Sequence, residues 1–343
     1  MPSAVQRAGV AISVQKIHTE KETTSTPAAS KPSENWVNQS STPPLDLQLN
    51  GYCGIDFNAD DLPLASIRGA VDSLRDDGGG QCLATIITDS LDRMCARIAR
   101  LRAAIESDPV IRSTIVGIHV EGPFINPEPG YHGAHPRRHV QVASTETAQQ
   151  LVDAGGGWVR LLTLAPEMDP GLQTTRKLAA LGIKVSAGHC NPSIDLLHEA
   201  VDAGLQLFTH LGNGCPSVLP RHDNVIQRVL ACQRLPFVMF IADGVHIPAM
   251  ALGNYLKCVE LDRVIAVTDA TSAAGMGPGR YQLAGQEVIV DSSGAAWSPD
   301  RTHLIGSTAT MPDVRRFLGT NLQLPHAAVD QLTAWNPRRS MGW

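Results

Sequence analysis

The stretch Gly117-Ile-His-Val-Glu-Gly-Pro-Phe-Ile-Asn126 is the starting point for interpreting the fold. A largely apolar run, residues 115–120, ends at one carboxylate, Glu121, and Gly122-Pro123 then stops the strand and turns the chain. His132-Gly133-Ala134-His135 follows within a short loop. A buried strand with an acid at its C-terminal tip indicates a functional site, whereas an isolated case is better explained by a solvated glutamate. The ends of the other strands therefore decide between the two interpretations.

The composition indicates a soluble globular protein. The chain has 343 residues, of which 43% are hydrophobic and 18% charged, and its net charge is −5 at pH 7. This length can bury a large core. An acidic balance disfavours nucleic acid and anionic membranes as partners. The longest apolar runs have the length of strands, so the sequence predicts no membrane-spanning segment.

Cysteine usage and the N-terminus indicate a cytoplasmic protein. The seven cysteines form no Cys-x-x-Cys pair, and residues 1–14 lack the pattern of a signal peptide. We therefore expect reduced thiols.

Two regions differ in composition. Residues 1–44 are polar and rich in Ser, Thr, Pro, Lys and Glu beyond one short candidate strand at residues 11–17, which predicts a largely flexible N-terminal segment. From Leu45 the pattern alternates between strand and helix, which predicts one catalytic domain over residues 45–343.

Eight apolar strands alternate with helices in that domain. They are predicted at Leu45–Leu49, Leu83–Ile87, Ile115–Glu121, Val159–Leu164, Lys184–His189, Leu205–His210, Phe237–Ala242 and Val264–Asp269. Helical patterns between them include Leu91–Ser107, Gly171–Leu181, Pro192–Ala203 and Pro248–Cys258. This alternation predicts an α/β fold, a (β/α)8 TIM barrel. A doubly wound open sheet is the alternative, but no Gly-rich phosphate fingerprint follows the first strand.

Polar side chains stand at the ends of several predicted strands. They are Glu121, His189, His210, His246 and Asp269. The C-terminal strand ends of such a barrel converge on one face, where active sites are built, so these residues should meet there. A lone histidine is more often structural, but five polar residues at equivalent positions are not explained by core packing.

Such a set of side chains contains the functional groups that metal-assisted hydrolysis of an amide or ester requires. One carboxylate with two imidazoles suits a divalent ion such as zinc with an open position for water, although the same ligand types also hold iron in oxygenases. The ion would favour ionisation of water near neutral pH. Asp269 could take up and return the proton, and His246 could stabilise the oxyanion.

Seven motifs together resemble the N-acetylglucosamine-6-phosphate deacetylase family of the amidohydrolase superfamily. They are His119-Val-Glu-Gly-Pro-Phe124, Gly133-Ala-His135, Ser186-Ala-Gly-His189, Thr209-His210, Ala242-Asp-Gly-Val-His246, Val267-Thr-Asp-Ala270 and Gly306-Ser307. The resemblance runs from about Leu45 to Asn336-Pro337, with the motifs in the family's order.

The resemblance implies a role for each site residue. The metal ligands would be Glu121, His189 and His210, with Asp269 as catalytic base and acid. The substrate contacts would be His135 and His246 at the sugar or acetamide, Asn213 and the Gly214 backbone at the phosphate, Leu304–Met311 at the acetyl end, and Arg221, which would reach the substrate of the neighbouring subunit in a homodimer.

Departures from other amidohydrolases favour one ion per chain. Gln48-Leu49-Asn50 stands where many members carry His-x-His for a second metal, and the fourth strand leads into Leu164-Ala165-Pro166-Glu167 without a bridging lysine. Zinc is the expected ion, with iron and manganese as alternatives. Gly212 and Gly214-Cys215 also depart from the family, which predicts a differently shaped phosphate loop.

The family carries a small accessory β-sandwich made from both ends of the chain. Here the N-terminal part is mostly polar, and the sequence stops six residues after Pro337, so the sandwich is predicted to be missing or vestigial. The function expected from the resemblance is removal of the acetyl group from N-acetylglucosamine-6-phosphate. One alternative is a deacetylase of another N-acyl amino-sugar phosphate, such as N-acetylgalactosamine-6-phosphate. The others are a hydrolase of another N-acyl compound or of a cyclic amide, and a sugar-phosphate binding protein that lost catalysis.

Overall fold

The computed structural model describes residues 42–343. The predicted polar segment, residues 1–44, lies almost entirely outside this range, as does the candidate strand at residues 11–17. The expectation of a missing or vestigial sandwich also concerns that segment and stays a prediction.

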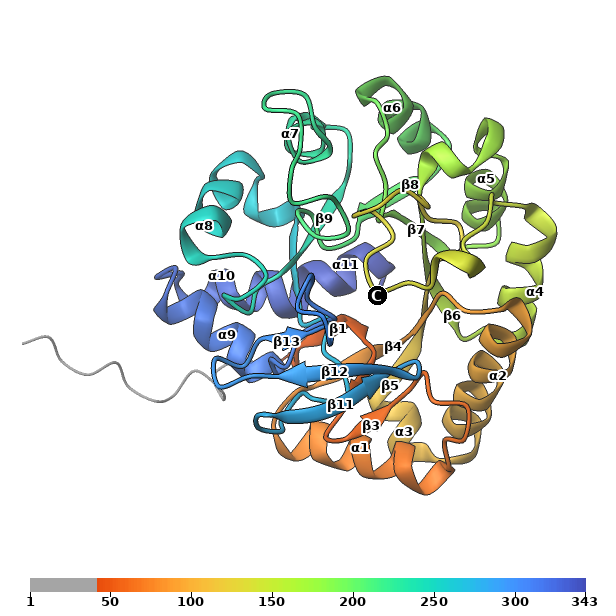
Figure 1. The fold of residues 1–343 in the computed structure, drawn as a ribbon, viewed down its shortest axis with the longest axis vertical. Coiled ribbons are helices and arrows are strands. Elements are labelled where there is room, and N and C mark those ends of the chain that lie inside the picture. The colour runs from red at the N-terminus through yellow and green to blue at the C-terminus, as the bar shows by residue number, and fades with distance from the viewer. Residues whose placement is uncertain (1–41) are drawn as a thin grey trace, which may run out of the picture. The chain divides into compact units, whose positions relative to one another are not determined.

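Eight parallel strands form the centre of the described part, in the order β1-β4-β5-β6-β7-β8-β9-β10 (Figure 1). Their bounds are β1 Leu45–Leu49, β4 Gln81–Ile87, β5 Ile115–Glu121, β6 Val159–Leu164, β7 Lys184–Ala187, β8 Leu205–Phe208, β9 Phe237–Ile241 and β10 Val264–Val267. Each strand pairs with the next one in the chain, which is the topology of a (β/α)8 barrel and confirms the predicted fold class.

The barrel closes where β1 meets β10. This seam carries one parallel bridge, between Leu49 and Ala270, and the Asn50 backbone N–H donates to the Ala270 carbonyl at 2.7 Å. Deeper in the seam, the Asp46 carboxylate accepts hydrogen bonds from the backbone N–H and the hydroxyl of Thr268. The seam therefore depends on a few polar contacts rather than on a continuous ladder.

Helices surround the strands in Figure 1. They are α1 Leu64–Asp76, α2 Leu91–Ser107, α3 Pro109–Thr114, α4 Thr145–Gly155, α5 Gln173–Ala180, α6 Ile194–Asp202, α7 Val225–Ala231, α8 Ala249–Cys258, α9 Met311–Thr320, α10 His326–Asp330 and α11 Asn336–Met341. The prediction for α2 is confirmed at both ends, whereas α5 begins after a short 3-10 turn, Pro170–Leu172. No helix within residues 42–343 is long and apolar enough to cross a membrane.

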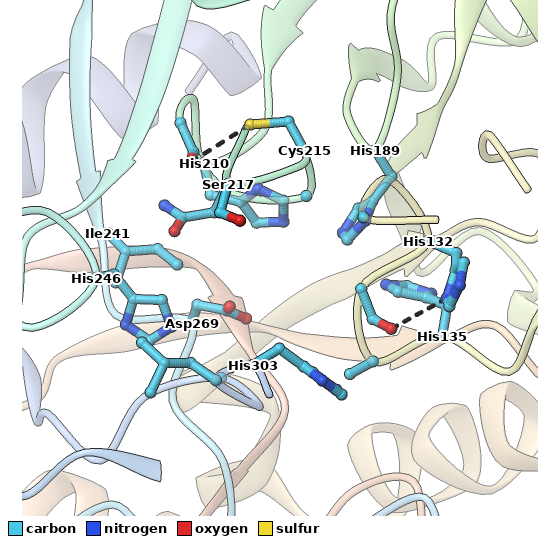
Figure 2. A pocket seen from close by; sticks show the side chains of 18 of the residues that line it. His132, His135, His189, His210, Cys215, Ser217, Ile241, His246, Asp269 and His303 are labelled. Carbon is cyan, nitrogen blue, oxygen red and sulfur yellow. Dashed lines mark hydrogen bonds between the residues drawn. The ribbon is translucent and has the colours of Figure 1, made fainter. Parts of the chain in front are cut away.

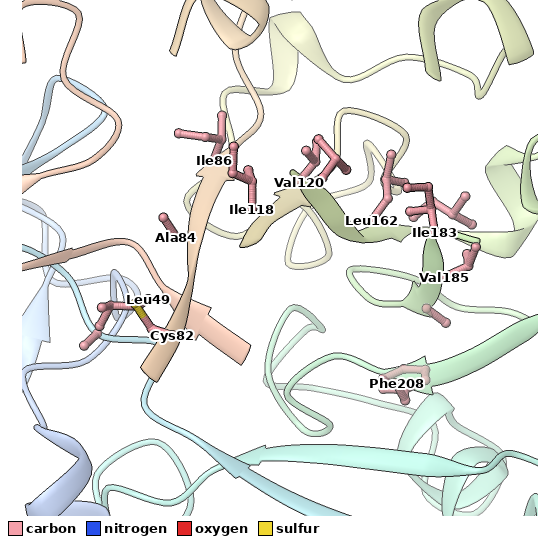
Figure 3. Close-up of a cluster of buried hydrophobic side chains, with 14 of the residues drawn as sticks. Leu49, Cys82, Ala84, Ile86, Ile118, Val120, Leu162, Ile183, Val185 and Phe208 are labelled. Atoms are coloured by element: carbon pink, nitrogen blue, oxygen red, sulfur yellow. The ribbon is translucent and has the colours of Figure 1, made fainter. Parts of the chain in front are cut away.

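Alternating side chains on the strands divide the core into two parts. Outward-facing side chains pack against the helices, and Figure 3 shows part of this layer, including Ile86, Val120 and Leu162. Inside the barrel, a smaller apolar cluster includes Leu47 and Met239. Polar side chains inside the barrel form a hydrogen-bonded chain: His119–Thr163, Thr163–Thr209 and Thr209–Ser186.

A three-stranded antiparallel sheet is inserted between β10 and α9, and the strand pattern of the sequence did not reveal it. Its strands are β11 Gly279–Leu283, β12 Gln286–Val290 and β13 Ala296–Trp297. A smaller hairpin, β2 Gly51–Tyr52 with β3 Ile55–Asp56, follows β1. The apolar face of the inserted sheet packs with Ile87 at the end of β4, which places this sheet at the C-terminal face of the barrel.

Candidate metal centre and active site

The polar residues predicted at the strand ends line one cavity of about 780 Å³. Glu121 is the last residue of β5, whereas His189, His210 and Asp269 each stand two residues beyond their strands, and His246 follows β9. Figure 2 shows the labelled members of this group around a common space. The structure thus brings together all five residues that the sequence placed at one face.

Three of these residues share an unusual backbone conformation. The φ angles are +51° at His189, +33° at His210 and +50° at Asp269, in the left-handed region that non-glycine residues seldom adopt. The predicted strands ran on to these residues, but the regular strands end two residues earlier at this change of direction. Such backbone strain concentrates at functional sites, where the surrounding structure must hold it.

Glu121, His189 and His210 form a cluster that could hold a metal ion. All three are buried, and one ligand atom from each lies within 4.8 Å of the other two. Glu121 Oε1 is 2.9 Å from His210 Nε2 and 3.3 Å from His189 Nε2. Two imidazoles and a carboxylate match the donor set of a catalytic divalent transition ion.

Hydrogen bonds at the far side of one imidazole also fit this assignment. His189 Nδ1 lies 2.6 Å from the Tyr131 carbonyl, which accepts its proton and leaves a lone pair on Nε2 toward Glu121. The buried His210 Nδ1 has no hydrogen-bond partner within residues 42–343.

Two buried amides hold the carboxylates of the site. Gln48 Nε2 donates to Glu121 Oε1 at 3.0 Å, and Asn50 Nδ2 donates to Asp269 Oδ1 at 2.8 Å. Both side chains are buried. An amide N–H supplies a positive partial charge to each carboxylate, which fits a site with a single ion.

Burial and neighbouring charges shift the pKa values of the two carboxyl groups, Asp269 and Glu121, in opposite directions. Burial raises the pKa of Asp269 to about 6, and the negative charge of Glu121 adds to the rise. Burial also opposes ionisation of Glu121, but interactions with the neighbouring imidazoles of His189 and His210 outweigh it and hold its pKa well below the usual value. One carboxylate therefore stays charged while the other can exchange a proton near neutral pH.

Histidines at the substrate side are held by partners of their own. His246 Nδ1 lies 2.7 Å from Asp243 Oδ2, and His135 Nδ1 lies 2.8 Å from the Thr88 hydroxyl. Burial, followed by the proximity of His189, lowers the pKa of His135 to about 3, so its ring is neutral.

The loop after β8 supplies the residues expected to meet the phosphate. Asn213 lines the cavity, and its buried Nδ2 has no hydrogen-bond partner among the described residues. Gly214 has φ +62°, and a Cβ built there would lie 2.8 Å from His189 Nδ1. A Cβ on Gly133 would lie 3.2 Å from the same ring. The two glycines therefore let two backbone segments approach the His189 ring closely.

Arg221 lies apart from the other predicted site residues. It is exposed, does not line the cavity, and forms no ion pair within residues 42–343. No lysine or arginine of the described chain lines the cavity at all. Of the loop predicted at the acetyl end, Leu304 and Gly306 line the cavity, whereas Met311 is buried at the start of α9.

Several residues of this site were not assigned from the sequence. They are Thr88, Tyr131, His132, Asp243, Trp297 and His303. Asp243 stood in the motif around His246, and its carboxylate three residues before a histidine was a usable signal. The Tyr131 contact is made by a backbone carbonyl. Every residue type has one, so the sequence does not reveal this contact.

Comparison with known proteins places the chain in a family. It is 34% identical to N-acetylglucosamine-6-phosphate deacetylase of Bos taurus over 285 residues, which covers 80% of this chain and 68% of that protein. The chain belongs to the N-acetylglucosamine-6-phosphate deacetylase family. No family model matches it.

A solved structure of the deacetylase family agrees with the fold. An Asp→Ala variant of N-acetyl-D-glucosamine-6-phosphate deacetylase from Mycobacterium smegmatis, in complex with N-acetyl-D-glucosamine-6-phosphate, aligns with a TM-score of 0.79 and 27% identity, and covers 88% of this chain and 77% of that one. N-acetylgalactosamine-6-phosphate deacetylase of Shewanella sp. (strain ANA-3) is 30% identical over 295 residues, or 85% of this chain and 72% of that protein.

Proposed function

We propose that this protein is a metal-dependent hydrolase that converts N-acetylglucosamine-6-phosphate and water to glucosamine-6-phosphate and acetate. The observation that carries the proposal is the buried cluster of Glu121, His189 and His210 on the same cavity as Asp269. Membership of the deacetylase family supplies the substrate class.

We assign the metal to Glu121 and the Nε2 atoms of His189 and His210. A divalent ion held there supplies Lewis-acid chemistry, which favours ionisation of water near neutral pH. Zinc is the expected ion because imidazole and carboxylate ligands suit it, with iron and manganese as alternatives. Gln48 and Asn50 hold the carboxylates of Glu121 and Asp269 in place, and we expect one ion per chain.

Asp269 is the proposed general base and acid. Its carboxylate takes a proton from the attacking water, which adds to the acetamide carbonyl carbon. It then gives that proton to the amide nitrogen as the C–N bond breaks, so that acetate and the free amine leave. A pKa of about 6 suits both steps, because the group is mostly ionised at neutral pH yet can be protonated.

The remaining site residues are proposed to hold the substrate. His246, oriented by Asp243, donates a hydrogen bond to the carbonyl oxygen as negative charge develops there. His135 contacts the sugar or its acetamide. Asn213 Nδ2, a buried donor without a partner in the described chain, and the Gly214 N–H meet the phosphate.

The phosphate also needs a cation that the described chain does not place in the cavity. We propose that Arg221 of a second subunit supplies it in a cytoplasmic homodimer, since a guanidinium donates two parallel hydrogen bonds to phosphate. The exposed position of Arg221 outside its own cavity supports this arrangement.

Acetate release from N-acetylglucosamine-6-phosphate tests the proposal, with metal content measured on the same sample. We expect turnover that disappears on chelation and returns with one equivalent of zinc. Absence of acetate release from fully loaded protein would favour the alternative of a binding protein without catalysis.

The galacto epimer, N-acetylgalactosamine-6-phosphate, is the second candidate substrate. The 30% identity to a deacetylase of that substrate supports it. Parallel kcat/KM measurements on the two epimers rank the candidates directly.

A further inference from the structure

The inserted sheet, β11 to β13 (residues 279–297), contacts both sides of the active site. On one side lies the histidine loop, residues 126–135, which follows Glu121 and carries His135. On the other side lies Asp269, at the end of β10. The two sides belong to β5 and β10, which β1 and β4 separate in the barrel, and the inserted sheet, together with residues 305–307, links them.

The link to the histidine loop is one hydrogen bond with local packing. Gln286 Nε2, at the start of β12, donates to the Ala134 carbonyl at 2.7 Å. The Ala134 side chain packs against the apolar cluster of the inserted sheet, which includes Leu283 and Val288. Ala134 directly precedes His135, and the Tyr131 carbonyl in the same loop orients His189.

The link to Asp269 runs through the backbone. The Ser307 N–H donates to the Asp269 carbonyl at 2.9 Å, and Ile305, two residues before it, donates to the Ala296 carbonyl of β13 at 2.9 Å. β13 pairs with β12, which carries Gln286. Short backbone segments and the hydrogen bonds between them therefore connect Asp269 to the histidine loop and, through Tyr131, to His189.

We propose that Gln286 is a positioning residue that fixes the histidine loop relative to the rest of the site. Through the Ala134 carbonyl it holds His135 toward the substrate, and through the Tyr131 carbonyl it keeps His189 in the orientation and tautomer that a metal ion requires. Asp269 is held separately by Asn50 and Ser307, so its position does not depend on Gln286.

The test compares Gln286→Met with Glu287→Gln in the full chain. Methionine keeps the length and apolar stem of the side chain but removes the donor. Glu287, the next residue of β12, pairs with Arg280 at 2.6 Å and is the matched control. Three quantities are measured: zinc affinity by competition with a chromophoric chelator, hydrogen exchange of residues 127–135, and kcat and KM, which rest on the proposed function.

For Gln286→Met we expect the zinc Kd and the KM to rise about three- to tenfold, as for the loss of one hydrogen bond. Exchange should quicken at the Tyr131 and His135 amides, which bond within the loop, while kcat at saturating zinc and substrate stays within about twofold. Glu287→Gln should match the parent protein in all three.

Unchanged zinc affinity, exchange and KM in Gln286→Met would overturn the proposal. So would a lower kcat with unchanged KM and zinc affinity, because that pattern indicates general structural damage. If the parent protein releases no acetate, the proposed function fails, and the zinc and exchange measurements still decide the role of Gln286.

Discussion

Burial, followed by the negative charge of Glu121, raises the pKa of Asp269 to about 6, although the hydrogen bond from Asn50 lowers it, so the group can exchange a proton near neutral pH. Asp269→Asn keeps the size and polarity of the side chain but removes the proton acceptor. We expect kcat to fall by about two to four orders of magnitude while zinc content and substrate affinity are retained. Single-turnover rates together with metal analysis check this, and near-normal turnover would place the base elsewhere.

Alanine substitutions at two glycines of the loop after β8 distinguish the effect of a strained backbone from the effect of a contact with the proposed metal ligand His189. Gly212 and Gly214 both have positive φ, at +93° and +62°. A Cβ on Gly214 would lie 2.8 Å from the His189 ring, whereas a Cβ on Gly212 would meet only Tyr255, at 3.9 Å. We expect both alanine variants to lose about 1–2 kcal/mol of stability from the left-handed backbone.

Only Gly214→Ala should also weaken zinc binding, by about tenfold or more, because the added methyl displaces His189. Chelator competition and thermal unfolding of the two variants measure the two effects. Equal zinc affinity in both variants would show that the loop can move away from the ring.

At the scale of elements, Asp46 joins β1 to β10 and makes the barrel seam sensitive to pH. Burial raises the pKa of Asp46 to about 7, against an ordinary value of 3.8. Folding therefore favours the protonated form, so this contribution to stability is complete below about pH 4 and is lost as the pH rises toward 7. The slope is about 1 kcal/mol per pH unit for one such group.

Asp46→Asn should remove this dependence. The asparagine oxygen can accept from the backbone N–H groups of Gln48 and Thr268, and the Thr268 hydroxyl can turn to the Gln48 carbonyl, 3.3 Å away. We expect the variant to be more stable than the parent at pH 8 and closer to it at pH 5. Urea unfolding across this range measures the difference, and parallel pH profiles would contradict the assignment.

The periodic part of the fold could be predicted because the helix and strand patterns repeat. All eight barrel strands were located, and the polar residues of the site were found because they stood near the ends of apolar runs, whereas the family resemblance implied which three of them would be the metal ligands. The inserted sheet was missed because its strands, such as β11, alternate exposed and partly buried residues and lack a continuous apolar run. Contacts through backbone carbonyls, such as Tyr131 with His189, depend on tertiary position and could not be predicted.

At the scale of the whole molecule, the proposed dimer requires that each active site combine residues from two chains. Arg221→Ala and Asp269→Asn should each be nearly inactive on the phosphorylated substrate. After the two variants are unfolded and refolded together, half of the dimers are mixed, and one site in each combines an intact Asp269 with the partner's intact arginine. About a quarter of all sites should recover activity.

This recovery requires that subunits have exchanged, which mass spectrometry of a tagged variant can establish. If Arg221 acts within its own chain, no site becomes whole, and activity stays at the average of the two variants. That result would rule out a shared site. Sedimentation of the parent protein gives the oligomeric state independently.

The seam between β1 and β10 also has a consequence for folding during synthesis on the ribosome. Its partners Asp46 and Thr268 are 222 residues apart, and every other strand of the barrel lies between them. On the ribosome, β1 can pair with β4 early, but its other edge stays open until β10 has emerged. An unpaired strand edge is a template for association with other chains. The nascent protein therefore carries an exposed edge through most of its synthesis, and this edge is where we expect chaperones to act.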